Sequence, residues 1–417
     1  MTIPAYLSPL LALFAAHGER AYPVGGCVRD SLMGLIPHDW DVAVTTVPER
    51  TVSLCEAAGY RTIPTGIRHG TITVLVPHSG RPTDREGGYD LIECTTCRTE
   101  GGYSDGRHPD SVAFTGRIAD DLSRRDFTVN AMAFDCPTAA EDTEITVIDL
   151  FGGRADLQCG IIRAVGDPDT RFSEDALRLL RAVRFAVKLG FCIEENTRAA
   201  IQRCAKGLSR VSRERISDEF QKILTSPHPD EGVAMLTELG LLPFVLPCGI
   251  SPDGVGRLSS LPADFAIRMA CLVWDMRGDA LEQNLAGLRL PNAVSKQIQT
   301  LARATLLPSR LTPRKAREWR HMLGQSALPA LEVRLARATE DAADLQAFAE
   351  LVRLSEERNE PVRISDLAVN GNDLIALGFK PGRLLQDVFC DLLEVVWDDP
   401  ERNTREELLA EAVRRRE

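Results

Sequence analysis

The chain has 417 residues, 44% of them hydrophobic and 26% charged, which is ordinary for a soluble globular protein of two to four domains. The apolar run at residues 7–16 is interrupted by Ser8 and Pro9 and is too short to cross a membrane, so we expect no membrane partner and a cytoplasmic location. Eleven cysteines, an odd number spread along a long chain, do not indicate a disulfide framework.

The net charge of −11 argues against a nucleic-acid partner, but the charge is unevenly distributed. Residues 171–222 include twelve basic and seven acidic residues, and residues 303–337 include eight basic and two acidic residues. Both stretches could bind a polyanion. The alternative is that they form the solvent-exposed faces of amphipathic helices, as most charged runs do.

Short strand-like runs alternate with turns and a few helices over the first 150 residues. The pattern predicts a helix at residues 28–35 and strands at residues 21–24, 71–76, 91–96 and 146–150. From about Asp169 onward, apolar residues recur at helical spacing, which predicts an all-helical second part. The expected fold is therefore α/β or α+β over the first 150 residues followed by helical segments, and Pro- and Gly-rich breaks near residues 242–262 and 353–365 indicate joints between these segments.

A glycine turn precedes two acidic residues near the N-terminus. Gly25 and Gly26 join a predicted strand to a predicted helix, where backbone amides can approach phosphate oxygens and Arg29 can reach the same group. Asp39 and Asp41 are two residues apart, so on a strand their carboxylates point to the same face and suit Mg²⁺. Alone, each feature is more often a structural turn or a solvated loop; together they indicate metal-assisted chemistry on a nucleoside triphosphate.

Two further candidate sites lie in the strand predicted at residues 91–96. Glu93 could place a third carboxylate beside the aspartates, as a metal ligand or a base, although a surface glutamate is the alternative. Cys94 and Cys97 have the spacing of a zinc pair. Because residues three apart on a strand face opposite sides and no second pair follows, we do not expect zinc there.

The run from Arg124 to Ala133 contains an arginine pair that we expect at the start of a helix, with Ser123 or Asp121 as its N-cap. In that position Arg125 could reach a phosphate and Asn130 a sugar hydroxyl, and Asp126 would lie beside them. Such a pair opposes the helix dipole, so a negative group is expected to compensate for it.

The most informative helical pattern covers residues 172–185, with Ser173 as the expected N-cap. Asp175, Arg178, Arg181 and Arg184 are spaced three apart and form a polar stripe. A carboxylate only accepts hydrogen bonds and a guanidinium only donates them, so Asp175 and Arg178 could pair with the amino group and ring nitrogen of cytosine or adenine and reject uracil and guanine. The alternative is a ladder of surface ion pairs.

These motifs together resemble those of the class II CCA-adding enzymes, the tRNA nucleotidyltransferases of the DNA-polymerase-β-like superfamily, whose head is shared with bacterial poly(A) polymerases. The resemblance covers nearly the whole chain. It rests on motifs at residues 25–30 with Asp39 and Asp41, 124–131, 174–178, 212–220, 366–374 and 378–382.

The resemblance implies an α+β fold: a DNA-polymerase-β-like nucleotidyltransferase head with a mixed sheet and helices at residues 1–150, followed by a helical neck at 151–225, body at 226–355 and tail at 356–417. It implies Mg²⁺ held by Asp39 and Asp41, and a motif at 212–220 that stabilises the base-reading helix. The implied partners are CTP, ATP and the tRNA acceptor arm, and a homodimer is possible. The implied nucleotide-binding residues are Gly26, Arg29, Arg125, Asp126, Asn130, Asp175, Arg178, Arg181 and Arg184, and Glu93 is our addition to the catalytic set.

The implied activity is template-independent addition of CCA to the 3′ end of tRNA. A poly(A) polymerase would share the head but usually carries a strongly basic C-terminal extension. A CC-adding or A-adding enzyme would differ in the glycine-rich loop at residues 99–110. A non-catalytic tRNA-binding descendant is expected to lose one of the aspartates or the Asp175 and Arg178 pair, all of which are present.

Overall fold

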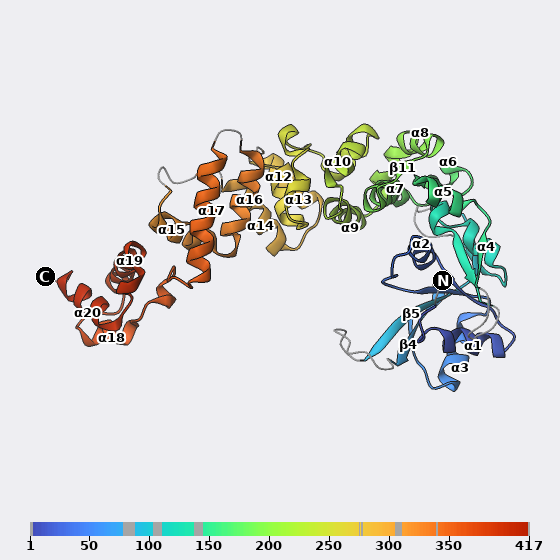
Figure 1. Ribbon diagram of the computed structural model, residues 1–417, viewed down its shortest axis with the longest axis horizontal. Helices are drawn as coiled ribbons and strands as arrows, with labels where there is room; N and C mark the ends of the chain where they lie inside the picture. The colour runs from blue at the N-terminus through green and yellow to red at the C-terminus, as the bar shows by residue number, and fades with distance from the viewer. Residues whose placement is uncertain are drawn as a thin grey trace. The chain divides into compact units, whose positions relative to one another are not determined.

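The computed structural model describes residues 3–77, 88–102, 111–136, 145–274, 276, 278–304, 311–338 and 341–415. Its contacts divide the chain into two compact units, Met1–Pro247 and Cys248–Glu417. In Figure 1 the first unit runs from blue to green and the second from yellow to red.

A seven-stranded mixed sheet forms the N-terminal part of the first unit, in the order β3-β4-β5-β2-β1-β8-β9. Strands β2 and β5 are parallel, and the other neighbours are antiparallel. A separate hairpin pairs β6 with β7. The strands are β1 (Ala21–Val24), β2 (Asp41–Val44), β3 (Arg61–Gly66), β4 (Thr71–Pro77), β5 (Tyr89–Thr96), β6 (Arg98–Gly101), β7 (Ser111–Phe114), β8 (Met132–Asp135) and β9 (Thr146–Asp149).

The two faces of this sheet have different roles. Trp40, Val42 and Val44 belong to the main core together with residues of α1 (Ser8–Ala16) and α3 (Pro48–Ala57), such as Phe14. Ala43, from the alternate position in β2, belongs to a smaller cluster. Because side chains alternate along a strand, Asp41 lies on the opposite face from Trp40. The Trp40 ring is therefore buried in the main core and turns away from Asp41.

Helices complete the first unit, and the prediction of a mixed sheet followed by a helical region is confirmed. One difference is a two-residue parallel ladder between β10 (Ile161–Ile162) and β11 (Cys192–Ile193), which ties the start of the helical part to the loop after α7. The remaining elements of this unit are α2 (Gly26–Leu32), α4 (Ile118–Ser123), the 3-10 turn η2 (Thr128–Asn130), α5 (Gly153–Cys159), α6 (Pro168–Glu174), α7 (Leu177–Leu189), α8 (Glu195–Cys204), α9 (Arg213–Leu224), α10 (Pro229–Glu238) and α11 (Leu242–Val245).

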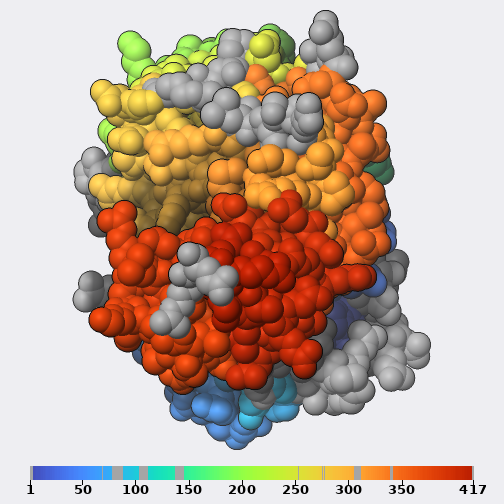
Figure 2. Space-filling model, turned by 90° about the vertical axis from the view of Figure 1, so that its left-hand side faces the viewer, coloured from blue at the N-terminus to red at the C-terminus, as the bar shows by residue number. Residues whose placement is uncertain are grey.

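The second unit is helical throughout its described residues. Leu374, Leu392 and Leu408 anchor a separate core among its last helices, which face the viewer in red in Figure 2. Its helices are α12 (Phe265–Leu272), α13 (Asp279–Gly287), α14 (Asn292–Arg303), α15 (Pro313–Leu323), α16 (Ala327–Arg337), α17 (Ala342–Glu357), α18 (Gly371–Ala376), α19 (Arg383–Asp398) and α20 (Arg405–Arg414).

Most of the described basic residues in the stretch 303–337 form contacts with other residues of this unit. Arg314 pairs with Glu318 and Asp398, and the buried Arg317 pairs with Glu360. These arginines stabilise the packing of α15 against α19 and the segment after α17. The buried Arg317 fits neither interpretation of this stretch, a polyanion-binding surface or solvent-exposed faces of amphipathic helices.

The described residues bear on the expectations about a membrane-spanning helix and about a zinc pair at Cys94 and Cys97. No helix in them combines the length and the apolar character needed to span a bilayer. Cys94 and Cys97 are both buried, and they lie in different hydrophobic clusters.

Candidate nucleotide-binding site

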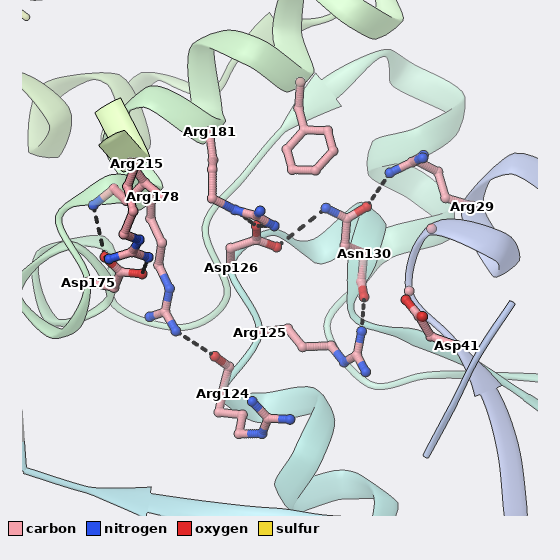
Figure 3. A pocket seen from close by; sticks show the side chains of 14 residues that line it. Arg29, Asp41, Arg124, Arg125, Asp126, Asn130, Asp175, Arg178, Arg181 and Arg215 are labelled. Carbon is pink, nitrogen blue, oxygen red and sulfur yellow. Dashed lines mark hydrogen bonds and ion pairs between the residues drawn. The ribbon is translucent and has the colours of Figure 1, made fainter. Parts of the chain in front are cut away.

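A polar cavity of about 470 Å³ lies within the first unit, a size typical of small-molecule sites, which span roughly 300–1,000 Å³. Figure 3 shows its lining side chains converging from α2, the start of β2, the segment after α4, η2, α7 and α9. The lining consists of Gly25, Gly26, Arg29, Asp41, Arg124, Arg125, Asp126, Asn130, Asp175, Leu177, Arg178, Arg181, Phe185 and Arg215.

One end of the cavity is the glycine turn. Gly25 has φ +78°, a conformation that favours glycine, and a Cβ there would lie 2.7 Å from Nη1 of Arg125. The turn therefore needs glycine both for its backbone and for the approach of Arg125. Gly26 begins α2, and Arg29 on that helix lines the cavity although it is only 3% exposed.

Carboxylates gather beside this end. Asp41 begins β2 and is the direct cross-strand partner of Glu93 on β5. Burial, then the charges of Glu93 and Asp39, raise the pKa of Asp41, and Arg125 opposes them. Asp39 precedes the strand, and its Oδ1 lies 2.9 Å from Nδ1 of His38. Among these three carboxylates only Asp41 lines the cavity, and Asp39 is not on the strand where the sequence places it.

The arginine pair is placed differently from the prediction. Helix α4 ends at Ser123, so Arg124 and Arg125 follow its C-terminus and do not open a helix. This position suits the helix dipole. The predicted compensating negative group is present: buried Asp121 accepts hydrogen bonds from both arginines, and Glu100 also pairs with Arg124. Burial would raise the pKa of Asp121, but Arg125 and Arg124 outweigh it and hold the pKa below its ordinary value.

Four of the lining residues are linked by a chain of hydrogen bonds. Arg29 donates from Nη1 to Oδ1 of Asn130 at 2.6 Å, and Nδ2 of Asn130 donates to Oδ1 of Asp126 at 3.3 Å. Arg181 on α7 donates from Nε to the other oxygen of Asp126 at 2.8 Å. Burial would raise the pKa of Asp126, but Arg181 lowers it below its ordinary value. Asp126 is therefore ionised at neutral pH.

The other end of the cavity holds the predicted acceptor and donor pair. Asp175 has an extended backbone between α6 and α7, and its Oδ1 accepts a hydrogen bond from the amide of Leu177. This hydrogen bond takes the place of the N-cap that was predicted at Ser173, which lies inside α6. Arg178 is oriented by Glu174 at 2.6 Å and by the carbonyl oxygen of Arg124 at 3.0 Å.

Helix α9 supports this end. Arg215 donates to Oδ2 of Asp175 at 2.7 Å, and Glu219 pairs with Arg184 at 2.8 Å. Arg184 is therefore turned toward α9 and is not among the lining residues, unlike Arg178 and Arg181. Burial lowers the pKa of Arg184, opposed by Glu219.

The structure thus brings nine of the predicted residues to one cavity: Gly26, Arg29, Asp41, Arg125, Asp126, Asn130, Asp175, Arg178 and Arg181. Asp39, Glu93 and Arg184 lie outside the lining. The sequence interpretation missed Arg215 and Phe185 as lining residues. The ring of Phe185 lies under three guanidinium groups, with Arg184 at 4.2 Å, Arg181 at 5.3 Å and Arg29 at 5.5 Å. The residues 103–110 of the glycine-rich loop lie outside the described residues.

Family models match most of the chain in three parts. Residues 21–163 match the poly A polymerase head domain, and residues 190–249 match the probable RNA and SrmB-binding site of polymerase A. Residues 266–412 match a tRNA nucleotidyltransferase domain 2.

Whole-length relatives point to the same family. The chain is 36% identical to a CCA-adding enzyme of Limosilactobacillus fermentum, over 99% of this chain and 98% of that protein. It is 34% identical to a CCA-adding enzyme of Enterococcus faecalis, over 98% and 95% of the two chains.

Solved structures agree with this fold. The CCA-adding enzyme of Bacillus stearothermophilus in complex with CTP matches with a TM-score of 0.78 and 29% identity, over 99% of this chain and 98% of that one. The Thermotoga maritima enzyme complexed with tRNA matches in fold, with a TM-score of 0.71 and 22% identity, over 99% and 95% of the two chains. With the relatives above, these matches show that the chain belongs to the CCA-adding enzymes of the class II nucleotidyltransferase family.

Proposed function

We propose that this protein adds CCA to the 3′ end of tRNA, without a nucleic-acid template, from CTP and ATP. The observation that carries the proposal is that a hydrogen-bond acceptor, Asp175, and a hydrogen-bond donor, Arg178, line one end of the cavity. The other end of the same cavity is a glycine turn beside Asp41. A nucleoside triphosphate would place its base at the first end and its phosphates at the second.

Base selection follows from hydrogen-bond complementarity. Cytosine and adenine each present an amino donor next to an unprotonated ring nitrogen, which match a carboxylate and a guanidinium. Uracil and guanine present a carbonyl and a ring N–H there, so each would leave buried groups unpaired at a cost of about 1–3 kcal/mol per group. Arg215 and Glu174 hold the two reading side chains before the nucleotide arrives, which lowers the ordering cost of binding.

The residues at the phosphate end fit a hard divalent cation. Burial and then the charge of Glu93 raise the pKa of Asp41, and a cation bound beside this carboxylate would stabilise its charged form. Asp39 and Asp41 would hold Mg²⁺, with Glu93 as their neighbour. When bound, Mg²⁺ neutralises charge that develops on the phosphate oxygens.

The reaction is attack of the tRNA 3′-hydroxyl on the α-phosphate of CTP, twice, and then of ATP, releasing pyrophosphate each time. The residues of the chain contribute mainly by positioning and by electrostatics. Arg29 and Arg125, next to the glycine turn, face the phosphate end, where a guanidinium can donate two parallel hydrogen bonds to phosphate oxygens.

The partners proposed for the rest of the chain follow from the family. The Bacillus stearothermophilus relative was solved with CTP and the Thermotoga maritima relative with tRNA. We propose that residues 226–355 and 356–417, the body and tail, hold the tRNA acceptor arm, and that residues 1–150 and 151–225 form the head and neck. The cytoplasmic location and a homodimer stay predictions.

The function is tested by sequencing the 3′ ends of a tRNA that lacks CCA after incubation with the protein, Mg²⁺, and CTP and ATP separately and together. The proposal predicts complete CCA ends only when both nucleotides are present. Ends that stop at CC, a single A added only to a CC end, or a long A tail would instead identify a CC-adding enzyme, an A-adding enzyme or a poly(A) polymerase. Binding of tRNA without any extension would identify a non-catalytic descendant.

A further inference from the structure

Asn130 lies between two arginines that come from different helices. Its side-chain oxygen accepts a hydrogen bond from Arg29 and its side-chain nitrogen donates one to Asp126, which in turn binds Arg181. Figure 3 shows Asn130 centred between Arg29 and Asp126, with Arg181 beyond. Arg29 belongs to α2 at the phosphate end, and Arg181 belongs to α7, which also carries Arg178.

The chemistry of the neighbours fixes the amide orientation. Arg29 can only donate and the ionised Asp126 can only accept, so the amide oxygen must face Arg29 and the amide nitrogen must face Asp126. Among side chains of this length, only asparagine supplies an acceptor and a donor together. Asn130 and Asp126 are 6% and 8% exposed, so water cannot easily replace either bond.

From this chain of bonds we propose that Asn130 is a positioning residue which couples Arg29 on α2 to Arg181 on α7. It does so by fixing α2 relative to α7 through Asp126, and not by binding the sugar hydroxyl that its sequence motif suggests. The inference rests on the proposed function, since it assumes that the cavity holds a nucleoside triphosphate. Its consequence is that the energetic contributions of the two arginines to nucleotide binding are not independent.

A double-mutant cycle on CTP affinity tests the coupling. CTP affinity is measured with Mg²⁺ and without tRNA, for Arg29→Met, Arg181→Met and the double variant. We expect the double variant to lose roughly 3- to 10-fold less affinity than the product of the single losses, as for residues in one network. In the Asn130→Ala background, the fold losses of CTP affinity caused by the two arginine substitutions should multiply. The proposal would be overturned if the two single losses of CTP affinity simply multiplied in the wild-type background. It would also be overturned if the coupling persisted in the Asn130→Ala background.

Two further variants keep the test decisive if Asn130→Ala does not fold. Asn130→Asp is nearly isosteric and keeps an acceptor for Arg29 but has no N–H for Asp126 when ionised, so it should also abolish the coupling. Phe185→Leu removes the ring that touches both arginines and leaves the hydrogen bonds, so the coupling should persist. Coupling lost in Phe185→Leu and kept in Asn130→Asp would assign it to the ring and refute our assignment.

A matched control pair uses Arg29→Met with Arg215→Met. Arg215 lines the cavity but binds Asp175, outside this chain of bonds, so these losses should multiply. The sugar alternative is tested with 2′,3′-dideoxy-CTP. Our proposal predicts that Asn130→Ala weakens binding of CTP and of the dideoxy analogue by the same factor. A loss that disappears with the dideoxy analogue would show a direct sugar contact instead.

The outcome is separable from that of the proposed function. A protein that binds CTP with the coupling but does not extend tRNA would refute only the proposed function. A protein that adds CCA while the two arginines act independently would refute only the role of Asn130.

Discussion

Side chains proposed to read the base are held by other charged groups before any nucleotide binds. Asp175 is oriented by Arg215, and Arg178 by Glu174. Such pairs restrict side-chain motion, so the hydrogen-bond pattern offered to the base is already formed. Selection for cytosine and adenine would then depend on a few fixed atoms.

Replacing Arg178 by alanine should relax base selection. The variant removes the donor that a uracil or guanine N–H opposes, so discrimination against UTP and GTP should fall by about 10-fold or more, as expected for a mismatch of about 1–3 kcal/mol. The measurement is kcat/KM for each of the four nucleotides with a tRNA acceptor. Arg203→Ala, at an exposed ion pair with Asp169, is the control and should leave selection unchanged. Unaltered selectivity in Arg178→Ala would refute the role of this arginine.

Asp121 should contribute to stability in a pH-dependent way. Its pKa is lowered in the folded state, so its contribution is complete above the unfolded pKa of about 4 and is lost as pH falls through the folded pKa. Asp121→Asn leaves Arg125 without its carboxylate partner and Arg124 with Glu100 alone, and it should lower the free energy of unfolding at pH 7 by about 3 kcal/mol.

The check is denaturant unfolding of the wild type and of Asp121→Asn from pH 7 down to about pH 3, below the ordinary aspartate pKa. The difference between the two proteins should shrink at the acidic end. The control Asp169→Asn, at an exposed position, should have the same free energy of unfolding as the wild type at both ends of the pH range. An equal loss at both ends of the range would mean that the charge of Asp121 is not what stabilises the fold.

Residues close together in the sequence were predictable, and those brought together by folding were not. Asp175 and Arg178 are three residues apart, and both line the cavity that also contains the Gly25 turn. Arg215 escaped prediction because it lies 40 residues after its partner Asp175. Arg184 continues the polar stripe of α7, but that helix also faces α9, and only the structure shows that Glu219 binds it.

At the scale of elements, strands were easier to predict than helix ends. The strand at residues 21–24 matches β1, and the run at 71–76 matches β4 to within one residue. The helix expected from Ser173 instead begins at Leu177, because Asp175 interrupts the helical backbone and caps α7. The arginine pair looked like a helix start because Ser123 is a good N-cap, yet Ser123 is the last residue of α4.

The packing of α9 on α7 should depend on Glu219. Its side chain is only 5% exposed and pairs with Arg184, so Glu219→Gln leaves a buried guanidinium without its charge partner. We expect a loss of about 3 kcal/mol in the free energy of unfolding, measured by denaturant titration. Glu238→Gln is the matched control, since Glu238 is 60% exposed in its ion pair with Arg198 and should lose less than about 1 kcal/mol. Equal effects of the two variants would contradict this account.

For the whole molecule, the cavity belongs entirely to the first compact unit. All its lining residues fall between Gly25 and Arg215, within Met1–Pro247. The sequence predicts the change from sheet to helices. The family match, and not the net charge of −11, indicates that the chain acts on RNA. The charged run at residues 303–337 illustrates why: a count of basic residues does not reveal which of them are already paired.

A fragment of residues 1–247 should bind CTP and bind tRNA poorly. We expect its CTP affinity to stay within about 3-fold of the full chain, which is less than about 1 kcal/mol, and its tRNA affinity to fall by at least about 10-fold. The measurement is binding of each ligand to the fragment and to the full chain, with circular dichroism to confirm that the fragment folds. A folded fragment that kept full tRNA affinity would contradict the proposed role of residues 248–417.

The most direct test of the account is whether nucleotide transfer takes place at this cavity. Incorporation of labelled CTP into a tRNA lacking CCA is measured for the wild type, Asp41→Ala and Asp39→Ala, alongside tRNA affinity and thermal unfolding. The account predicts that both variants fold, bind tRNA as the wild type does and incorporate no detectable nucleotide. Incorporation at the wild-type rate by a folded Asp41→Ala variant would contradict it.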